Sequence, residues 1–181
     1  AASDVYKRQP VHVYATVGTG MGAALIIDGR PVHGLQHPEI GHARVRRVPG
    51  DGFAGACPFH GDCLEGLVCG PAIAARTGHP AGDLASDHPV WTKVGFELGE
   101  FVALMILAAA PHRIVFGGGV ILGQEQLLPL VRKAAADSLA GYGAAVTVDD
   151  LQSRVLPAAL GRDAGPIGAL ILAESAIGRP R

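Results

Sequence analysis

A closely spaced set of metal-binding side chains constrains this chain more than any other feature of its sequence. Cys57, His60 and Cys63 are each separated by two residues, within the run Cys-Pro-Phe-His-Gly-Asp-Cys. One tight turn can therefore present two thiolates and an imidazole to a single ion, and this ligand set suits Zn²⁺. The spacing predicts a zinc site. The alternative is a Cys57–Cys63 disulfide, or free thiols beside surface histidines.

A tetrahedral zinc site requires a fourth ligand, and two histidines upstream are candidates. We favour His42, because it ends the run Pro-Glu-Ile-Gly-His and the glycines between 50 and 55 allow the chain to turn back; His37 is the competitor. Two thiolates and two neutral imidazoles cancel the charge of Zn²⁺, so the site can be buried. Four protein ligands leave no open position for water, which indicates a structural ion. We expect the remaining cysteine, Cys69, to pack in the core.

Two carboxylates lie on either side of these ligands in the sequence. Glu39 comes three residues before His42, and Glu65 comes two residues after Cys63. Folding of the zinc site would bring both acids near one place, where ionised carboxylates can accept hydrogen bonds from the hydroxyls of a sugar. The two acids serve equally well as hydrogen-bond partners of the zinc ligands or as solvated surface groups.

Two glycine-rich loops follow predicted strands. In the first, Gly18-Thr19-Gly20-Met21-Gly22, unobstructed backbone N–H groups and the Thr19 hydroxyl can face a polyphosphate. No Gly-Lys-Ser or Gly-Lys-Thr follows, so this is not a P-loop, and a simple tight hairpin is the alternative. The second loop, Gly117-Gly118-Gly119, allows close approach of a flat ligand such as a nucleoside base, or is only a strand-to-helix turn.

Apolar periodicity and turn residues predict a mixed α/β order. We expect strands at 11–17, 23–27, about 31–34, 113–116 and 145–148. We expect helices from Leu64 with Asp62 as its cap, from Pro71 to just before Gly78, at 90–110, at 124–139 and at about 164–177.

Composition limits the classes of protein to which the chain can belong. Its 181 residues are 49% apolar and 17% charged, which fits one globular domain. A formal net charge of −1 gives no broad basic field for nucleic acid or an anionic membrane. The apolar run 101–110 is too short to span a bilayer. Three cysteines within thirteen residues suit metal binding in a reducing compartment, so we expect a cytoplasmic protein.

The first nine residues stand apart from the rest. There is no initiating Met, and Asp4-Val5-Tyr6-Lys7-Arg8-Gln9 looks like a translated library adaptor. We therefore expect 1–9 to be non-native, and 10–181 to form a C-terminal domain whose N-terminal domain lies upstream of Pro10.

Taken in order, these motifs, together with Gly70-Pro71-Ala72-Ile73 and Val120 after the second glycine loop, resemble the ROK family of repressors, open-reading-frame proteins and sugar kinases. The resemblance runs from about Tyr14 to Ala176, and the Cys-His form of the zinc motif is most similar to the bacterial fructokinase branch. It implies an actin-like ATPase (ribonuclease H-like) fold, with this chain as the large C-terminal domain of a two-domain kinase. It also implies a homodimer that transfers the γ-phosphoryl of ATP, with Mg²⁺, to a hexose, with fructose favoured.

The resemblance also implies roles for individual residues. The zinc ligands would be His42, Cys57, His60 and Cys63. The sugar would be faced by Glu39, His42 and Glu65. The phosphates would be held at Gly18, Thr19, Gly20 and Gly22, and the adenosine at Gly117, Gly118 and Gly119.

Two features of the family have no counterpart in this sequence. These are the Asp-Gly-Gly-Thr phosphate-binding segment and the catalytic base, an Asp in an Asn-Asp pair, and neither role fits Asp4, Asp28 or Asp51. We therefore assign no catalytic residue, and we expect the 181-residue chain to be inactive alone although the intact gene product is a kinase. The main alternative is the sugar-binding effector domain of a ROK repressor, with a helix-turn-helix upstream. A third is a zinc-stabilised sugar-binding protein without catalysis.

Overall fold

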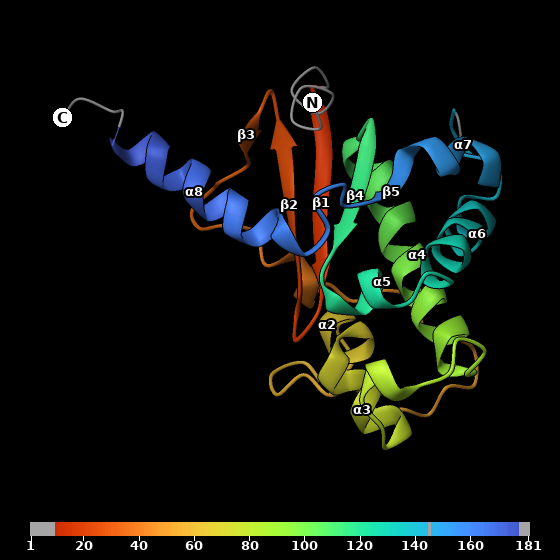
Figure 1. The fold of residues 1–181 in the computed structure, drawn as a ribbon. Helices are drawn as coiled ribbons and strands as arrows, with labels where there is room; N and C mark the ends of the chain where they lie inside the picture. Colours follow the sequence, from red (N-terminus) through yellow and green to blue (C-terminus); the bar gives the residue numbers. More distant parts are fainter. Residues whose placement is uncertain (1–9, 145, 178–181) are drawn as a thin grey trace.

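The computed structural model describes residues 10–144 and 146–177, which form a mixed α/β structure around one sheet (Figure 1). The strands are β1 (Val11–Val17), β2 (Met21–Ile27), β3 (Arg30–Pro31), β4 (Arg113–Gly117) and β5 (Val155–Pro157), in the order β3-β2-β1-β4-β5. The central β1 is antiparallel to β2, with Val17 opposite Met21, and parallel to β4. The β1–β2 hairpin therefore turns through only three residues, 18–20.

Helices pack on the sheet and also lie beyond one end of it. The α-helices are α2 (Leu64–Val68), α3 (Gly70–Thr77), α4 (Val90–Ala109), α5 (Gly119–Gly123), α6 (Leu127–Leu139), α7 (Val148–Arg154) and α8 (Ala164–Ile177). Short 3-10 turns are η1 (Ile40–His42), η2 (Ala81–Asp83) and η3 (Gly161–Asp163). In Figure 1, α2 and α3 lie below the β1–β2 turn, and α8 projects from the sheet to the opposite side from α6.

The core lies between the sheet and α4. Apolar residues spaced by three and four along α4 face the sheet, and the Phe101 ring meets the Phe116 ring of β4 edge to face, with centroids 6.3 Å apart. Behind it, α4 and α6 pack closely because glycines remove side chains from the contact. A Cβ at Gly95 would lie 2.6 Å from the Cβ of Leu130, and a Cβ at Gly99 would lie 2.5 Å from that of Ala134. Burial of these apolar faces holds the helical layer to the sheet.

Several expected elements form as predicted. β1 and α8 have the expected bounds. α3 begins one residue earlier than expected and ends as expected, with Gly78 as its left-handed C-cap, while α4 ends one residue earlier and β2 begins two residues earlier. The third strand is shorter than expected, with two residues, Arg30–Pro31. The helix expected at 124–139 is α6 and begins at Leu127; a separate short helix, α5, precedes it.

The strand expected at 145–148 is wrong for 146–148, and Ala145 lies outside the described residues. Thr147 instead caps α7: its side chain accepts from the Asp150 N–H, and the Asp150 carboxylate accepts from the Thr147 N–H. This capping box starts a helix where apolar alternation suggested a strand. The chain becomes extended only at Val155, which pairs with Ile114 of β4.

The predicted cap of α2 is also wrong. Cys63 occupies the N-cap position of α2, without a side-chain cap hydrogen bond. The Asp62 carboxylate instead lies 3.2 Å from the Arg44 guanidinium.

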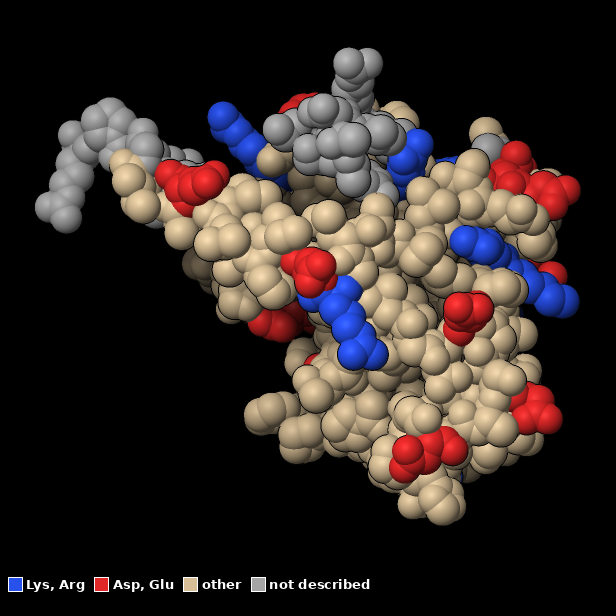
Figure 2. All heavy atoms as spheres, viewed as in Figure 1, with Lys and Arg blue, Asp and Glu red and all other residues tan. Residues whose placement is uncertain are grey.

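Lys, Arg, Asp and Glu are scattered over the face in Figure 2. Along α8, Leu170 and Leu172 are exposed. Among the residues that the structure describes, no helix combines the length and the apolar character needed to cross a bilayer.

Candidate functional site

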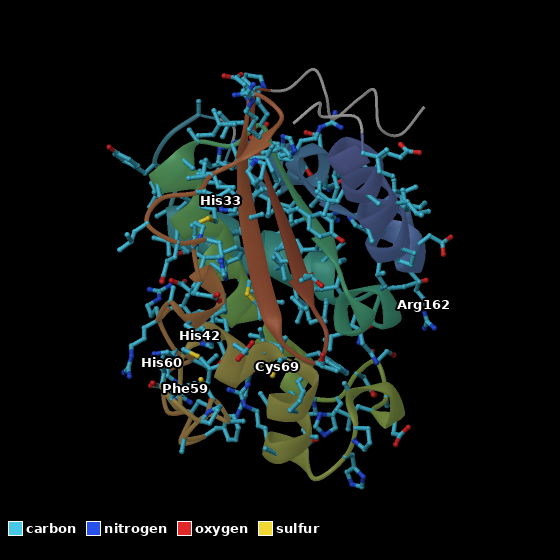
Figure 3. All side chains as sticks on the ribbon, turned by 90° about the vertical axis from the view of Figure 1, so that its left-hand side faces the viewer. His33, His42, Phe59, His60, Cys69 and Arg162 are labelled. Carbon is cyan, nitrogen blue, oxygen red and sulfur yellow. The ribbon has the colours of Figure 1, made fainter. Side chains whose placement is uncertain are left out.

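Four potential metal ligands converge below the sheet, beside α2. His42 ends η1, and Cys57, His60 and Cys63 come from the segment that leads into α2. Cys57 and Gly61 exchange backbone hydrogen bonds of 3.1 and 2.9 Å, which close a tight turn and direct its side chains to one side. A backbone bond of 2.9 Å from Leu64 N to Ala43 O joins the start of α2 to the residue after His42. Figure 3 shows the His42 and His60 side chains close together, with Cys69 apart from them.

The distances within this cluster fit a tetrahedral metal site. The Nδ1 of His42 lies 3.7 Å from the Cys57 Sγ and 3.5 Å from the Cys63 Sγ. The Nδ1 of His60 lies 3.7 Å from the Cys57 Sγ, and all four ligand atoms fall within 4.8 Å of one another. Zn–S bonds of about 2.3 Å and Zn–N bonds of about 2.0–2.1 Å place tetrahedral ligand atoms roughly 3.3–3.8 Å apart. The four side chains can therefore hold a metal ion such as zinc.

The two cysteines of the cluster are buried free thiols in different environments. Burial raises the pKa of the Cys63 thiol. Burial acts in the same direction on Cys57, but hydrogen bonds with the backbone of His60 and Phe59 lower the pKa of that thiol overall. The disulfide alternative does not hold, because both cysteines are free. Cys69 is also a free, buried thiol, as expected, and precedes α3 outside the cluster.

Glu65 connects the metal-ligand cluster to the β1–β2 hairpin. Its Oε2 accepts a hydrogen bond from the Met21 N–H at 3.1 Å, and its Oε1 lies 4.0 Å from the His42 Nδ1. The carboxylate remains half-buried, so part of it faces solvent. A Cβ at Gly20 would lie 2.8 Å from the Glu65 Oε2, so the hairpin can approach this carboxylate because residue 20 is glycine.

Glu39 lies in a more open environment than Glu65. Its carboxylate accepts from His37 Nε2 at 2.5 Å, and both side chains are exposed. The structure thus brings His42, not His37, to the cysteines, and pairs His37 with Glu39.

A pocket of about 750 Å³ opens beside the β1–β2 hairpin turn, on the side away from the metal-ligand cluster (Figure 3). Gly18 and Thr19 form one wall, and the first half of α3 and the 80–82 segment form another. The remaining wall comes from α5, Gln124 and Arg162. Most of this lining is apolar side chain or glycine backbone, which suits a flat, largely apolar group with a polar tail. Figure 3 shows Arg162 on the opposite side of the hairpin from His42 and His60.

The predicted glycines divide into those that line the pocket and those that serve packing. Gly18, Thr19 and Gly119 line it, whereas Gly22 lies within β2, opposite Thr16. Gly117 and Gly118 lie where a Cβ would collide with the Tyr14 hydroxyl and the Val17 backbone, and Gly118 has a φ of +91°. These two glycines allow β4 to turn closely against β1.

Sequence analysis did not identify two polar residues of the pocket, Gln124 and Arg162. The Gln124 side chain donates to the Ala81 carbonyl at 3.0 Å and accepts from Gln126 at 2.7 Å, so it fastens the 80–82 wall to the start of α6. Neither residue belongs to a motif, and only the fold brings them beside the glycine loop.

A partly buried ionic cluster was also not predicted. It is formed by Arg47, Asp51, Arg76, Lys93 and Glu97. Asp51 accepts from Lys93 at 2.8 Å, Arg47 at 3.0 Å and Arg76 at 3.1 Å. Arg76 also donates to both carboxylate oxygens of Glu97, at 2.8 and 3.2 Å. This ionic cluster joins the segment before Cys57 to α3 and α4.

Burial and pairing shift the pKa values of the two carboxyl groups of this cluster in opposite directions. Burial raises the pKa of Glu97, which has no exposed surface, and the Arg76 hydrogen bonds only partly offset this. Burial acts to raise the pKa of Asp51 as well, but hydrogen bonds from Lys93 and Arg47 outweigh it, and the pKa is lowered.

Comparisons with known proteins identify relatives across most of the chain. The sequence model of the ROK family matches residues 4–176. The chain is 39% identical over 173 residues to a fructokinase of Pediococcus pentosaceus, covering 96% of this chain and 59% of that protein. It is 40% identical over 167 residues to a fructokinase of Zymomonas mobilis, covering 91% of this chain and 54% of that protein. The chain thus spans somewhat more than half the length of these relatives.

Solved structures of ROK family proteins also match this chain. A ROK family glucokinase from Streptomyces griseus, in complex with glucose and AMPPNP, matches with a TM-score of 0.70 and 26% identity, over 93% of this chain and 62% of that one. The expected α/β fold of the actin-like ATPases is confirmed by such neighbours. A ROK family transcriptional regulator matches with a TM-score of 0.61 and 21% identity, over 86% of this chain and 44% of that one, and shows the shared fold alone.

Proposed function

Because the chain belongs to the ROK family, we propose that it is part of an ATP-dependent kinase that phosphorylates a hexose, with fructose converted to fructose 6-phosphate. One observation carries this proposal: the three-residue β1–β2 turn lines a nucleotide-sized pocket on one side and approaches the half-exposed Glu65 carboxylate on the other. Gly18 and Thr19 line the pocket, whereas Gly20 and Met21 contact Glu65. A phosphoryl donor and a hydroxyl acceptor on the two sides of this turn would be close enough for transfer.

We assign the acceptor side to Glu39, His42 and Glu65. The half-exposed Glu65 carboxylate can accept hydrogen bonds from sugar hydroxyls while its Oε2 stays bonded to the hairpin. Such charge-assisted bonds at fixed positions distinguish hexose epimers. The fructose preference is supported by the similarity to the fructokinases of Pediococcus pentosaceus and Zymomonas mobilis.

We assign the donor side to the pocket. Its apolar walls suit the adenine of ATP, and the Thr19 hydroxyl with the N–H groups of Thr19 and Gly20 suits phosphate oxygens, with Mg²⁺ bound to the phosphates. Gly18 would contribute to the wall by lacking a side chain, since its N–H already donates to the Gly20 carbonyl at 2.9 Å. Gly22 and Gly117 to Gly119 remain proposed contributors to the nucleotide site. Of these, Gly119 has the most direct support, because it lines the pocket.

We propose that His42, Cys57, His60 and Cys63 bind Zn²⁺. Held by four protein ligands, zinc would supply no reactive position and would act only as a structural link. The link would fix His42 relative to α2, and therefore relative to Glu65 on the same helix. Sugar position would then depend on metal content without any step of the reaction passing through the ion.

Several properties of the whole protein are also proposals. The free cysteines support a reducing, cytoplasmic location, and a homodimer remains the expectation from the family resemblance. Because the sequence contains no counterpart of the Asn-Asp catalytic pair, we propose that the 181-residue chain alone has no kinase activity.

The second candidate is the sugar-binding effector domain of a ROK repressor, which the family resemblance also allows. Calorimetry on the 181-residue chain distinguishes the two. The kinase proposal expects binding of AMPPNP with Mg²⁺, whereas an effector domain would bind sugar without any response to nucleotide.

The direct test is a coupled assay of ADP release by the complete gene product with fructose, glucose and mannose. We expect ATP-dependent turnover that is fastest with fructose. Absence of turnover with all three sugars, from protein that is folded and contains its metal, would contradict the proposal.

A further inference from the structure

The pocket that we assign to the nucleotide contains one charged side chain, that of Arg162. Every other residue in the lining is glycine, apolar or neutral and polar. Arg162 lies on η3 between β5 and α8, far in sequence from the glycine hairpin. Its side chain is exposed and, among the residues that the structure describes, makes neither an ion pair nor a hydrogen bond.

Other polar groups of the pocket are already engaged or uncharged. The Gln124 amide is bonded to Ala81 and Gln126, which leaves it fewer free hydrogen-bonding positions for a ligand. Thr19 offers a neutral hydroxyl. The guanidinium of Arg162 is therefore the strongest unoccupied donor that faces this space.

Charge complementarity indicates which part of a nucleotide this guanidinium would meet. The base and ribose of ATP are neutral and have apolar walls available, at Pro71, Ala74 and Val120. The phosphate chain carries all of the negative charge, and the lining holds no carboxylate to oppose it. A guanidinium can give two parallel hydrogen bonds to a phosphate, and it keeps its charge at every physiological pH.

We propose that Arg162 binds the phosphate chain of the nucleotide from the side opposite the Gly18–Thr19 turn, and so determines affinity for the phosphoryl donor. The inference rests on the proposed function. It adds a specific binding residue that is absent from every motif of the sequence.

The test is titration calorimetry of the 181-residue chain with ATP, ADP and adenosine, in the presence of Mg²⁺. We expect Arg162→Gln to weaken ATP and ADP binding about ten-fold and to leave adenosine binding within two-fold of wild type. Arg162→Lys, which keeps a charge but loses the planar fork, should fall between the two. Raising the salt concentration should weaken ATP binding to wild type more than to Arg162→Gln.

Arg30→Gln is the matched control, since Arg30 is an exposed arginine of β3 that does not line the pocket. It should bind all three ligands as wild type does, and thermal melting should show that each variant is folded. Unchanged ATP affinity in Arg162→Gln would overturn the inference alone. Equal weakening of ATP and adenosine would overturn it in favour of stacking on the base, whereas a wild-type chain that binds no nucleotide would overturn the proposed donor site with it.

Discussion

The Oε2 of Glu65 accepts a hydrogen bond from the backbone N–H of Met21 at 3.1 Å, and this bond joins the first turn of α2 to the start of β2. The other carboxylate oxygen, Oε1, lies 4.0 Å from the His42 Nδ1. Glu65 thus contacts both the hairpin and a proposed metal ligand. A change in charge at this residue should alter sugar binding more than it alters folding.

Glu65→Gln should lower kcat/KM for fructose at least ten-fold in the complete gene product. The amide keeps an oxygen that can accept from Met21, so the fold is retained, but it loses the charge that strengthens bonds to hydroxyls. Steady-state kinetics and thermal melting measure the two effects. Glu174→Gln, at an exposed position of α8, is the control and should retain wild-type kinetics. A Glu65→Gln enzyme with unchanged kcat/KM would remove Glu65 from the sugar site.

Gly41→Ala should destabilise the chain by about 1–3 kcal/mol, because its Cβ would collide with the Met21 carbonyl and force η1 away from the hairpin. Gly52→Ala is the control, since a Cβ there meets no atom within 4 Å. Urea unfolding of both variants measures the difference in the free energy of unfolding. Equal stability of the two variants would show that η1 does not depend on this close approach.

Purified, unchelated protein should contain about one zinc ion per chain by elemental analysis. Cys63→Ser should lose the metal and unfold at a lower temperature, because binding free energy at a structural zinc site adds to folding free energy. Cys69→Ser should keep the full metal content even if it is less stable, since Cys69 lies outside the cluster. Metal-free wild type with an unchanged melting temperature would argue against a structural ion.

Arg76→Met should cost about 3–5 kcal/mol, because it leaves the buried Glu97 carboxylate without its donor. Adding Glu97→Leu should recover part of that loss, since the second substitution removes the uncompensated group. Lys133→Gln, which breaks an exposed pair with Asp137, should change stability by less than about 1 kcal/mol. Chemical unfolding of the three variants tests this order; a double variant less stable than Arg76→Met would contradict it.

Asp51 should make stability depend on pH in the acid range. Its folded pKa lies below the ordinary value of 3.8, so its contribution is present above that value and is lost as pH falls through the lower folded pKa. The difference in unfolding free energy between wild type and Asp51→Asn should therefore be constant from pH 7 to 5 and shrink below pH 3.8. A difference that grows on acidification would show the opposite shift.

Some elements of the fold could be predicted from local sequence signals, whereas others depend on tertiary pairing. β1 could be predicted from its alternating apolar residues, α3 from Pro71 and Gly78 at its ends, and α4 from its apolar residues spaced by three and four. Each of these signals lies within the segment that it predicts. β5 could not, because its three residues become a strand only by pairing with β4. The capping box at Thr147 is a local signal as well, and it starts a helix despite the apolar residues beside it.

The candidate site shows the same division. Spacing alone identified Cys57, His60 and Cys63, but the choice between His42 and His37 depends on η1 packing against Met21. Arg162 reaches the pocket only through the fold, and it carries no sequence signal. Buried charges at 51, 76 and 97 likewise have no periodic spacing that would indicate their contact.

The brevity of the β1–β2 turn has a consequence for the evolution of this site. Gly18 and Thr19 form the pocket wall, and Gly20 alone connects them to Met21, the residue bonded to Glu65. One inserted amino acid would displace donor from acceptor by up to about 3.3 Å, the rise of an extended residue. Relatives that keep catalysis should therefore preserve the length of this turn.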